Sequence, residues 1–146
     1  MVGMQLRRCN LEDLKEVDKV EKASFSKPFT YQMFSLFLKN YPEGFIVAED
    51  RGKIVGYIIY SVFGDKAMIV SIGVLPEYRR RGTGQILLEY TLNTLRSKVR
   101  SVELQVSLSN STAIRLYQKN GFIIVDVIPR YYPDGKDAYL MKKTFT

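Results

Sequence analysis

The sequence predicts one α/β domain built around a mixed β-sheet. In the first half of the chain, three predicted strands joined by tight turns follow one another, and in the second half strands alternate with amphipathic helices. The 146 residues are the size of one ordinary domain and contain no repeat, linker or low-complexity segment. We therefore expect residues 1–146 to form a single domain.

The first predicted elements are a strand and two helices. Residues 4–9 are expected to form the strand, and Asn10 can cap a helix that runs to about Ser24 with apolar residues near one face. Pro28 ends this stretch before a second helix at residues 31–39. The segment between the helices is unusually aromatic for a loop, and it forms either a cap on the core or one wall of a substrate cleft.

Three antiparallel strands are expected next, at residues 44–49, 54–63 and 67–75. They are separated by short segments of the kind that make tight turns. Gly73 lies inside the last of these strands, where a glycine indicates a β-bulge or the close approach of a ligand.

The remainder of the chain predicts two more helices and three more strands. One helix is expected to end near Lys98, and Asn110 can cap another that runs to about Lys119, with Gly121 after it. The strands are expected at residues 101–106, 122–128 and 138–142.

Composition narrows the class of protein. No apolar run is long enough to span a membrane and the N-terminus lacks a signal-peptide pattern, so we expect a cytoplasmic protein without membrane contact. One cysteine and no histidine argue against a metal site, and Cys9 is expected to be a small core residue. The net charge is +7, but only Arg79–Arg81 form a dense basic cluster, which favours a local anion site over a nucleic-acid surface.

That cluster belongs to residues 71–88, which predict a strand end, a turn and the start of a helix. Gly82 and Gly84 allow the backbone to approach a ligand closely, and the first N–H groups of a helix bind anions. The helix dipole alone contributes only ~0.3–1 kcal/mol at an exposed site, so the arginines must add attraction. The segment therefore predicts a diphosphate site.

Two familiar phosphate motifs do not fit this segment. A Walker loop needs Lys and then Ser or Thr after its second glycine, whereas Gln85 and Ile86 follow Gly84. A dinucleotide fingerprint needs a small residue where Leu87 stands, although Glu103 lies near the position of its acid.

A third pattern fits closely. The run Val74-x-Pro76-x-Tyr78-Arg79-x-x-Gly82-x-Gly84 resembles the acetyl-CoA motif of the GNAT superfamily of N-acetyltransferases. The resemblance reaches from about Cys9 to Met141, and its later part resembles RimI-type protein N-terminal (Nα) acetyltransferases. It implies the GNAT fold, a mixed, mostly antiparallel sheet of about seven strands, splayed between the fourth and fifth and flanked by about four helices. The later motifs are Ser109-Asn110, Ala113, Leu116-Tyr117, Gly121-Phe122, Tyr131-Tyr132 and Asp137-Ala138…Met141.

The resemblance also implies a role for individual residues in binding acetyl-CoA. The pantetheine arm would pair with the strand end at Ile72, Gly73 and Val74, and the Val74 N–H would polarise the thioester carbonyl. Tyr117 would protonate the departing CoA thiolate, or would be only a core aromatic. Asn110 would contact the cofactor arm, or would be only a helix cap. The pyrophosphate would lie on backbone N–H groups of Arg79, Arg80, Arg81, Gly82, Thr83 and Gly84.

The general base is where the chain departs from the family pattern. Many RimI-like enzymes have a Glu in the strand before Ser-Asn, and Gln105 stands at the matching position. Glu103 lies two residues earlier, on the same side of the strand, and is one candidate. A water held by Gln105 and backbone carbonyls is the other.

The expected acceptor is the α-amino group of a protein or peptide N-terminus. Tyr131 and Tyr132 resemble the tyrosine pair that closes the family's peptide channel, and Phe29 and Tyr31 could form the opposite wall. An α-amine has a pKa of ~7.7–8.0 against ~10.4 for lysine, so it needs less help from a base. The alternatives are acetylation of lysine or a small-molecule amine, or an acetyl-CoA-binding domain without activity. We expect a monomer or weak homodimer, with an auxiliary subunit as a further option.

Overall fold

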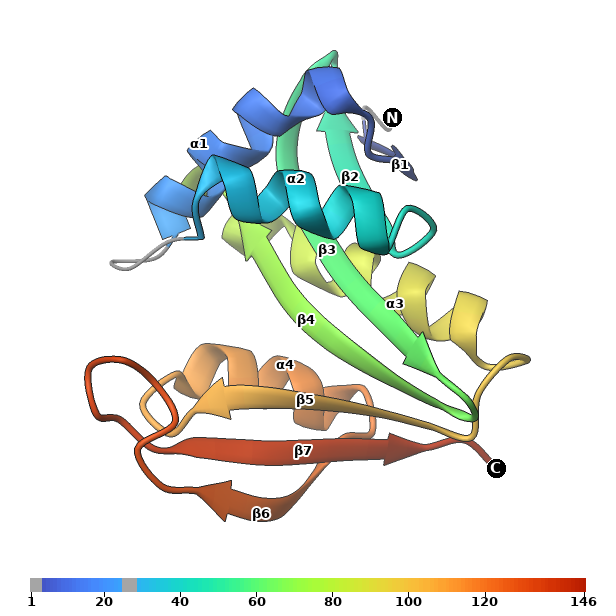
Figure 1. Cartoon of the computed structure of the whole chain (residues 1–146), viewed down its shortest axis with the longest axis vertical. Coiled ribbons are helices and arrows are strands. Elements are labelled where there is room, and N and C mark those ends of the chain that lie inside the picture. Colours follow the sequence, from blue (N-terminus) through green and yellow to red (C-terminus); the bar gives the residue numbers. More distant parts are fainter. Residues whose placement is uncertain (1–3, 25–28) are drawn as a thin grey trace. The chain divides into compact units, whose positions relative to one another are not determined.

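The computed structural model describes residues 4–24 and 29–146 and forms two compact units. Unit 1 comprises residues up to 61 together with 70–91, and unit 2 comprises 62–69 together with 92–146. Figure 1 shows the elements of both units. The chain therefore passes between the units within its third and fourth strands and within its third helix.

Seven strands form one mixed sheet with the order β1-β2-β3-β4-β5-β7-β6. The pairs β1–β2, β2–β3, β5–β7 and β6–β7 are antiparallel, whereas β4–β5 is parallel. The predicted split between the fourth and fifth strands is confirmed, since the parallel ladder covers only residues 66–68 of β4 and 101–103 of β5. The strands are β1 (Met4–Arg8), β2 (Phe45–Asp50), β3 (Lys53–Phe63), β4 (Lys66–Val74), β5 (Ser101–Ser107), β6 (Ile123–Ile128) and β7 (Ala138–Thr144).

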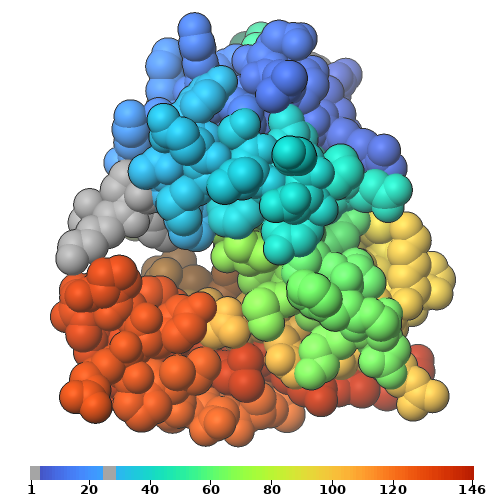
Figure 2. Space-filling model, viewed as in Figure 1, coloured from blue at the N-terminus to red at the C-terminus, as the bar shows by residue number. Residues whose placement is uncertain are grey.

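The core of unit 1 lies between its strands and the first two helices. α1 (Leu14–Ser24) and α2 (Tyr31–Asn40) lie over one face of the strands, as Figure 1 shows. Phe34 of α2 is fully buried and its ring meets that of Tyr57, from β3, edge to face at 5.5 Å. The outer face of α2 forms part of the molecular surface in Figure 2, and Leu36 there is 56% exposed. Aromatic packing therefore attaches α2 to the sheet.

The start of the first helical segment is fixed by polar contacts. Asn10 and Asp13 form a capping box around a 3-10 turn, η1 (Leu11–Asp13), that leads into α1. The Asp13 carboxylate also accepts two hydrogen bonds from Arg7 of β1, at 2.7 and 2.9 Å. These bonds join the first strand to the beginning of α1.

Unit 2 packs α4 (Ser111–Lys119) with β5, β6 and β7. Tyr117 of α4 meets Phe122 edge to face at 5.8 Å, and both side chains are buried. Met141 of β7 and Leu104 of β5 are buried neighbours in the ladder register. β6 is the edge strand, and most of its side chains are exposed.

The structure confirms the predicted order of strands and helices, with small shifts at the ends. α3 (Thr83–Leu95) ends three residues before the expected Lys98. The turn before it is a 3-10 helix, η2 (Pro76–Arg81). Four α-helices, α1 to α4, lie in the part of the chain that the structure describes, as the family fold implies.

Candidate active site

The segment from the end of β4 to the start of α3 lies in unit 1. β4 ends at Val74, η2 follows, and Gly82 adopts the left-handed conformation with φ 78°. A residue with a Cβ is strained at such a φ, so glycine is required at this turn. The first hydrogen bond of α3 joins Ile86 N to Gly82 O at 3.0 Å. The N–H groups before it are the ones that a helix start directs outward, toward an anion.

Thr83 is the first residue of α3 and has no solvent exposure. Its hydroxyl oxygen is buried and has no hydrogen-bond partner within the part of the chain that the structure describes. A buried polar atom of this kind costs stability unless a ligand or water satisfies it. The backbone N–H groups of the helix start are therefore the groups suited to an anionic ligand.

The three arginines differ in their surroundings. Arg80 and Arg81 are exposed, and the Arg81 guanidinium lies over the Tyr78 ring at 4.9 Å. Arg79 is exposed as well, but its Nε donates to the carbonyl oxygen of Val74 at 3.0 Å. Its side chain thus supports the strand end, and the expected contact of its backbone N–H with pyrophosphate stays a prediction.

Val74 is held through its carbonyl from a second direction as well. Ser24, the last residue of α1, has its Oγ 3.1 Å from the Val74 carbonyl oxygen. Arg79 also approaches the end of α1, with a guanidinium nitrogen 3.5 Å from the carbonyl oxygen of Ala23. The Ser24 hydroxyl has one proton and lies closer to the Val20 carbonyl oxygen, at 2.6 Å, so Arg79 supplies the main hydrogen bond to the Val74 carbonyl.

Gly73 lies under an aromatic ring. A Cβ at this position would be 2.6 Å from Cε1 of Tyr57, closer than any ordinary contact. Glycine here therefore permits the ring of a neighbouring strand to approach the β4 backbone. The expected bulge at Gly73 stays a prediction.

Tyr57 belongs to a buried polar network that includes Glu21 of α1. The Tyr57 hydroxyl donates to the Glu21 carboxylate, and Ser71 Oγ of β4 lies 2.8 Å from the Tyr57 hydroxyl oxygen. The Phe29 N–H donates to the same carboxylate at 2.9 Å. Glu21 is only 2% exposed. Burial raises the pKa of Glu21, although the hydrogen bonds from Tyr57 and Phe29 act in the opposite direction.

The two aromatic residues expected to face a substrate from unit 1 have different environments. The Phe29 ring packs edge to face with Phe34 and Phe37, at 5.9 and 5.4 Å. Tyr31, the first residue of α2, is 40% exposed. Residues 25–28 of this aromatic segment lie outside the described residues. Phe29 thus serves the core, which is one of the two roles expected for the segment, and a contact of Phe29 or Tyr31 with substrate stays a prediction.

Tyr117 lies on α4 in unit 2 and is 5% exposed. Burial raises the pKa of its phenol well above the ordinary value, with a smaller contribution from Tyr132. The phenol therefore stays protonated at neutral pH and has a proton to donate.

Asn110 caps α4. Its side-chain oxygen accepts from the Ala113 N–H at 3.2 Å, which confirms the helix-cap role. The cap uses only the amide oxygen, so the expected contact of Asn110 with the cofactor arm is compatible with it and stays a prediction.

The two base candidates lie on β5 beside β4, within unit 2. Glu103 forms an ion pair with Lys66 of β4, with Nζ 3.2 Å from a carboxylate oxygen. Gln105 Nε2 lies 3.9 Å from the sulfur of Met68, which is a weak contact. The one carboxylate of this pair, that of Glu103, has a cationic partner. The Glu that many RimI-like enzymes have in this strand is replaced by Gln105.

Tyr131 and Tyr132 lie in the loop between β6 and β7. Their rings meet edge to face at 4.9 Å, and Tyr131 is 47% exposed. Asp137 holds the start of the loop by accepting from the Arg130 N–H at 2.9 Å. Burial, followed by the neighbours Tyr131 and Asp134, raises the pKa of Tyr132 to about 12. The pair is thus presented by a loop with internal hydrogen bonds.

Cys9 is a buried core residue, as predicted, and follows β1 directly. Burial raises the pKa of its thiol to about 12, with a further contribution from Asp13. The thiolate is the nucleophilic form of cysteine, so a covalent acyl-enzyme on Cys9 is disfavoured.

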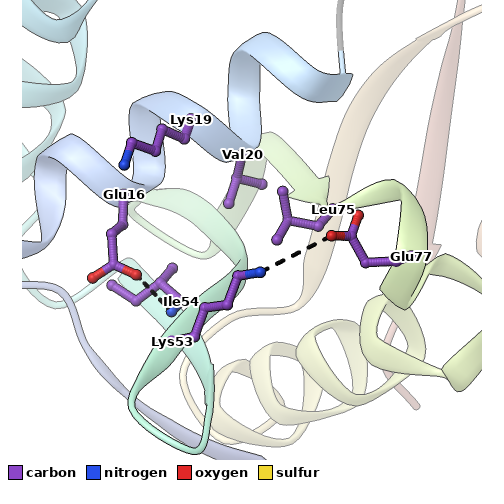
Figure 3. Close-up of a pocket in the computed structure, with 7 residues that line it drawn as sticks. All are labelled: Glu16, Lys19, Val20, Lys53, Ile54, Leu75 and Glu77. Atoms are coloured by element: carbon purple, nitrogen blue, oxygen red, sulfur yellow. Dashed lines mark hydrogen bonds and ion pairs between the residues drawn. The ribbon is translucent and has the colours of Figure 1, made fainter.

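A pocket of about 280 Å³ lies elsewhere on unit 1 (Figure 3). Three of its four charged groups contact neighbours, since Glu16 accepts from the Ile54 N–H at 3.0 Å and Lys53 lies 4.0 Å from Glu77. None of the predicted site residues lines it. The lining residues are Glu16, Lys19, Val20, Lys53, Ile54, Leu75 and Glu77.

Two kinds of feature are absent from residues 4–24 and 29–146. No helix there is long and apolar enough to cross a membrane. No three or more His, Cys, Asp and Glu side chains in that part gather closely enough to hold a metal ion.

The sequence analysis missed the buried network of Glu21, Tyr57 and Ser71. A signal for it was present, because Leu14, Val17, Glu21 and Ser24 follow the spacing of the buried helix face. An acid within an apolar stripe indicates a buried carboxylate with hydrogen-bond partners.

Comparison with known proteins agrees with this architecture. The profile described as the acetyltransferase (GNAT) family matches residues 14–122, and the chain belongs to this family. An N-alpha-acetyltransferase of Sulfurisphaera tokodaii is 37% identical over 94% of this chain and 90% of its own length. The ribosomal protein bS18-alanine N-acetyltransferase of Escherichia coli is 32% identical over 88% of this chain and 89% of its own length.

Solved structures show the same fold. Ard1 from Thermoplasma volcanium has a TM-score of 0.95 and 31% identity, and the match covers 99% of both chains. Naa20 of Chaetomium thermophilum, solved with a bisubstrate analogue, has a TM-score of 0.88 and 28% identity over 97% of this chain and 86% of its own. The expected GNAT fold is therefore confirmed, and the chain is an acetyltransferase-family enzyme.

Proposed function

We propose that this protein transfers acetyl from acetyl-CoA to the α-amino group of a protein or peptide N-terminus. The observation that carries the proposal is the folding of residues 74–84 as a strand end, a 3-10 turn and a helix start. This arrangement occurs in a chain whose relatives are named N-alpha-acetyltransferases. The whole chain would work as one domain.

Acetyl-CoA would bind along the segment from β4 to α3. Its pyrophosphate would lie on the N–H groups from residue 79 to Gly84, with the exposed guanidinium groups of Arg80 and Arg81 adding attraction. The pantetheine arm would pair with residues 72–74, and Asn110 would contact the arm through its side-chain nitrogen.

The transfer would proceed by direct attack. The neutral amine adds to the thioester carbonyl carbon, and the Val74 N–H donates a hydrogen bond to the oxygen that becomes negative. Collapse of the tetrahedral intermediate breaks the carbon–sulfur bond, and Tyr117 donates a hydrogen bond and then a proton to the leaving sulfur. Burial raises the pKa of Tyr117, so the phenol keeps its proton until the thiolate develops.

Removal of the amine proton needs little help for an α-amine. With a pKa of ~7.7–8.0, roughly a tenth of such groups are already neutral at pH 7. A lysine side chain, with a pKa of ~10.4, would need a base that this strand does not present. A water on Gln105 would accept the proton lost after attack, while Glu103 stays paired with Lys66.

The acceptor peptide would lie against the tyrosine pair. Tyr131 and Tyr132 would hydrogen-bond the first residues of its backbone, and Phe29 and Tyr31 would contribute the opposite wall. We further propose a cytoplasmic enzyme that acts as a monomer or weak homodimer, with an auxiliary subunit as an alternative state. It would require no metal and would not bind nucleic acid.

Mass spectrometry of a peptide library incubated with acetyl-CoA tests the proposal. Peptides with free N-termini should gain one acetyl group at the α-amine, whereas the same peptides with blocked N-termini and an internal lysine should not. Acetylation of the blocked peptides would replace the proposal with lysine acetylation. Acetyl-CoA binding by calorimetry without any transfer would replace it with a non-catalytic binding domain.

A further inference from the structure

The last turn of α1 carries two side chains that reach the end of β4. Ser24 contacts the Val74 carbonyl, and Glu21 reaches Gly73 through the ring of Tyr57. All of these residues belong to unit 1. α1 is therefore connected to Gly73 and Val74, the two residues joined by the peptide bond that carries the proposed oxyanion donor, the Val74 N–H.

Glu21 also contacts Phe29, the first residue of the segment Phe29–Tyr31, which we call the acceptor-side segment because it is proposed to face the peptide. Its second carboxylate oxygen accepts from the Phe29 N–H at 2.9 Å, just ahead of α2. One buried carboxylate thus connects the segment proposed to face the peptide with the strand proposed to activate the thioester. A Glu that is 2% exposed must have such partners, because an unpaired buried carboxylate is costly.

We propose that Glu21 is a positioning residue that sets the acceptor-side segment at Phe29 and the strand end at Gly73 and Val74 in their working geometry. It acts through two hydrogen bonds and the Tyr57 ring, and not by accepting a proton. The proposal rests on the proposed function for its kinetic effect. The physical reason is that a displacement of about 1 Å in a reacting geometry can lower the rate by about 10²-fold.

Three variants distinguish a positioning role of Glu21 from a role as proton acceptor. Glu21→Ala removes both hydrogen bonds. Glu21→Gln keeps an oxygen for the Phe29 N–H and an amide group for Tyr57, whose hydroxyl can then turn to Ser71. Tyr57→Phe removes the hydroxyl but keeps the ring over Gly73.

Glu16 provides a matched control on the same helix. It is also a carboxylate that accepts a backbone N–H, that of Ile54 at 3.0 Å, as Figure 3 shows. This hydrogen bond lies at the start of β3. Glu16 is not part of the proposed network. Glu16→Ala therefore removes a similar carboxylate–backbone hydrogen bond, and that bond involves neither Gly73 nor Val74.

The kinetic test is steady-state acetylation of a free N-terminal peptide, with the dissociation constant of acetyl-CoA measured by calorimetry. We expect Glu21→Ala to lower kcat/KM for the peptide about tenfold or more, and Tyr57→Phe about threefold or more. Glu21→Gln and Glu16→Ala should stay within about threefold of the unsubstituted protein, and the dissociation constant should change less than about threefold in all four variants. Unchanged kcat/KM in Glu21→Ala and Tyr57→Phe would overturn the proposal.

Two further results address the alternatives. If Glu21→Gln were as impaired as Glu21→Ala and its pH–rate profile lost an ionisation, Glu21 would be a proton acceptor and the positioning role would be wrong. If Glu21→Ala did not fold, Tyr57→Phe would decide the kinetic test, because its ring packing remains.

The network can also be tested without any activity. In amide NMR spectra, Glu21→Ala and Tyr57→Phe should shift the signals of Gly73 and Val74, while Glu16→Ala should leave both in place. Signals unmoved by all three substitutions would overturn the connection itself. A protein that acetylates no peptide but shows these shifts would disprove the proposed function and leave the network standing.

Discussion

Lys66 and Glu103 form an ion pair across the parallel β4–β5 ladder, with Nζ 3.2 Å from the carboxylate. The Glu103 side chain is only 14% exposed, so a substantial part of this contact is shielded from water. The ion pair directs the Glu103 carboxylate toward Lys66, and no contact of this carboxylate with another residue of the proposed site is observed among the described residues.

Glu103→Gln should therefore have little effect on catalysis. We expect kcat/KM for an N-terminal peptide to stay within about threefold, with only a modest loss of stability. Turnover measured by mass spectrometry and thermal unfolding together check this expectation. A loss of more than about a hundredfold, the size expected for removal of a general base, would identify Glu103 as the base.

Gln105 offers the opposite experiment. Gln105→Glu places a carboxylate where many RimI-like enzymes have a Glu. The substitution removes only the weak contact with Met68. Below pH 7 little of the α-amine is neutral, so an added base should help most there. We expect kcat/KM at pH 6 to rise at least about threefold relative to the unsubstituted protein. Equal rates at every pH would show that no base is needed at this position.

Tyr117→Phe should separate binding from turnover. The ring contact with Phe122 remains, so folding and acetyl-CoA affinity should be preserved. Loss of the proton donor should lower kcat about tenfold or more. Calorimetry with acetyl-CoA and single-turnover kinetics check the two parts. A variant with the original kcat would exclude Tyr117 from the mechanism.

The contact between Arg7 and Asp13 should stabilise the protein at neutral pH. Burial alone would raise the pKa of Asp13, but the hydrogen bonds from Arg7 and from the Asn10 N–H outweigh it and the net pKa is lowered. The stabilisation is therefore fully present above the unfolded pKa of ~3.9 and is lost as pH falls through the lower folded pKa. Asp13→Ala should reduce the free energy of unfolding by about 1–3 kcal/mol at pH 7, measured by urea denaturation. An equal difference from the unsubstituted protein at pH 7 and pH 2.5 would contradict this account.

The contribution of Glu21 to the free energy of unfolding should change with pH in the opposite direction to that of Asp13. Burial raises the pKa of Glu21 in the folded state, so the folded state favours the protonated acid. Ionising the buried carboxyl carries a stability penalty, which is absent below the unfolded pKa of ~4.3. The penalty grows as pH rises through the raised folded pKa. Glu21→Gln carries no such charge, so its stability relative to the unsubstituted protein should increase between about pH 4 and pH 8. Thermal unfolding across this range, with Glu16→Gln as the control, measures the difference. A constant difference would show that the Glu21 pKa is not raised.

Much of the fold could be predicted because its signals are local. The capping pair of Asn10 and Asp13, the turn at residues 50–53 and the helix cap at Asn110 each depend on residues close in sequence, and all three are present. The end of α3 could not be placed, because apolar spacing continues past Leu95 to Val99 and does not reveal where the helical hydrogen bonds stop.

The candidate site divides in the same way. The glycines and the helix start at residues 82–84 were predicted from a contiguous motif. The hydrogen bond of Arg79 to the Val74 carbonyl depends on the direction that its side chain takes, and the bond of Tyr57 to Glu21 joins residues that are distant in sequence. The spacing of α1 marks Glu21 as a buried acid, but it does not identify Tyr57 as the partner.

Cys9 has a practical consequence for measuring this reaction. Each acetyl transfer would release one molecule of CoA, which carries a free thiol. The protein's single cysteine is buried and its thiol is held protonated, so a chromogenic thiol reagent should report the released CoA with almost no background from the folded enzyme. Slow growth of that background would then record unfolding, which allows one cuvette to follow turnover and the integrity of the fold together.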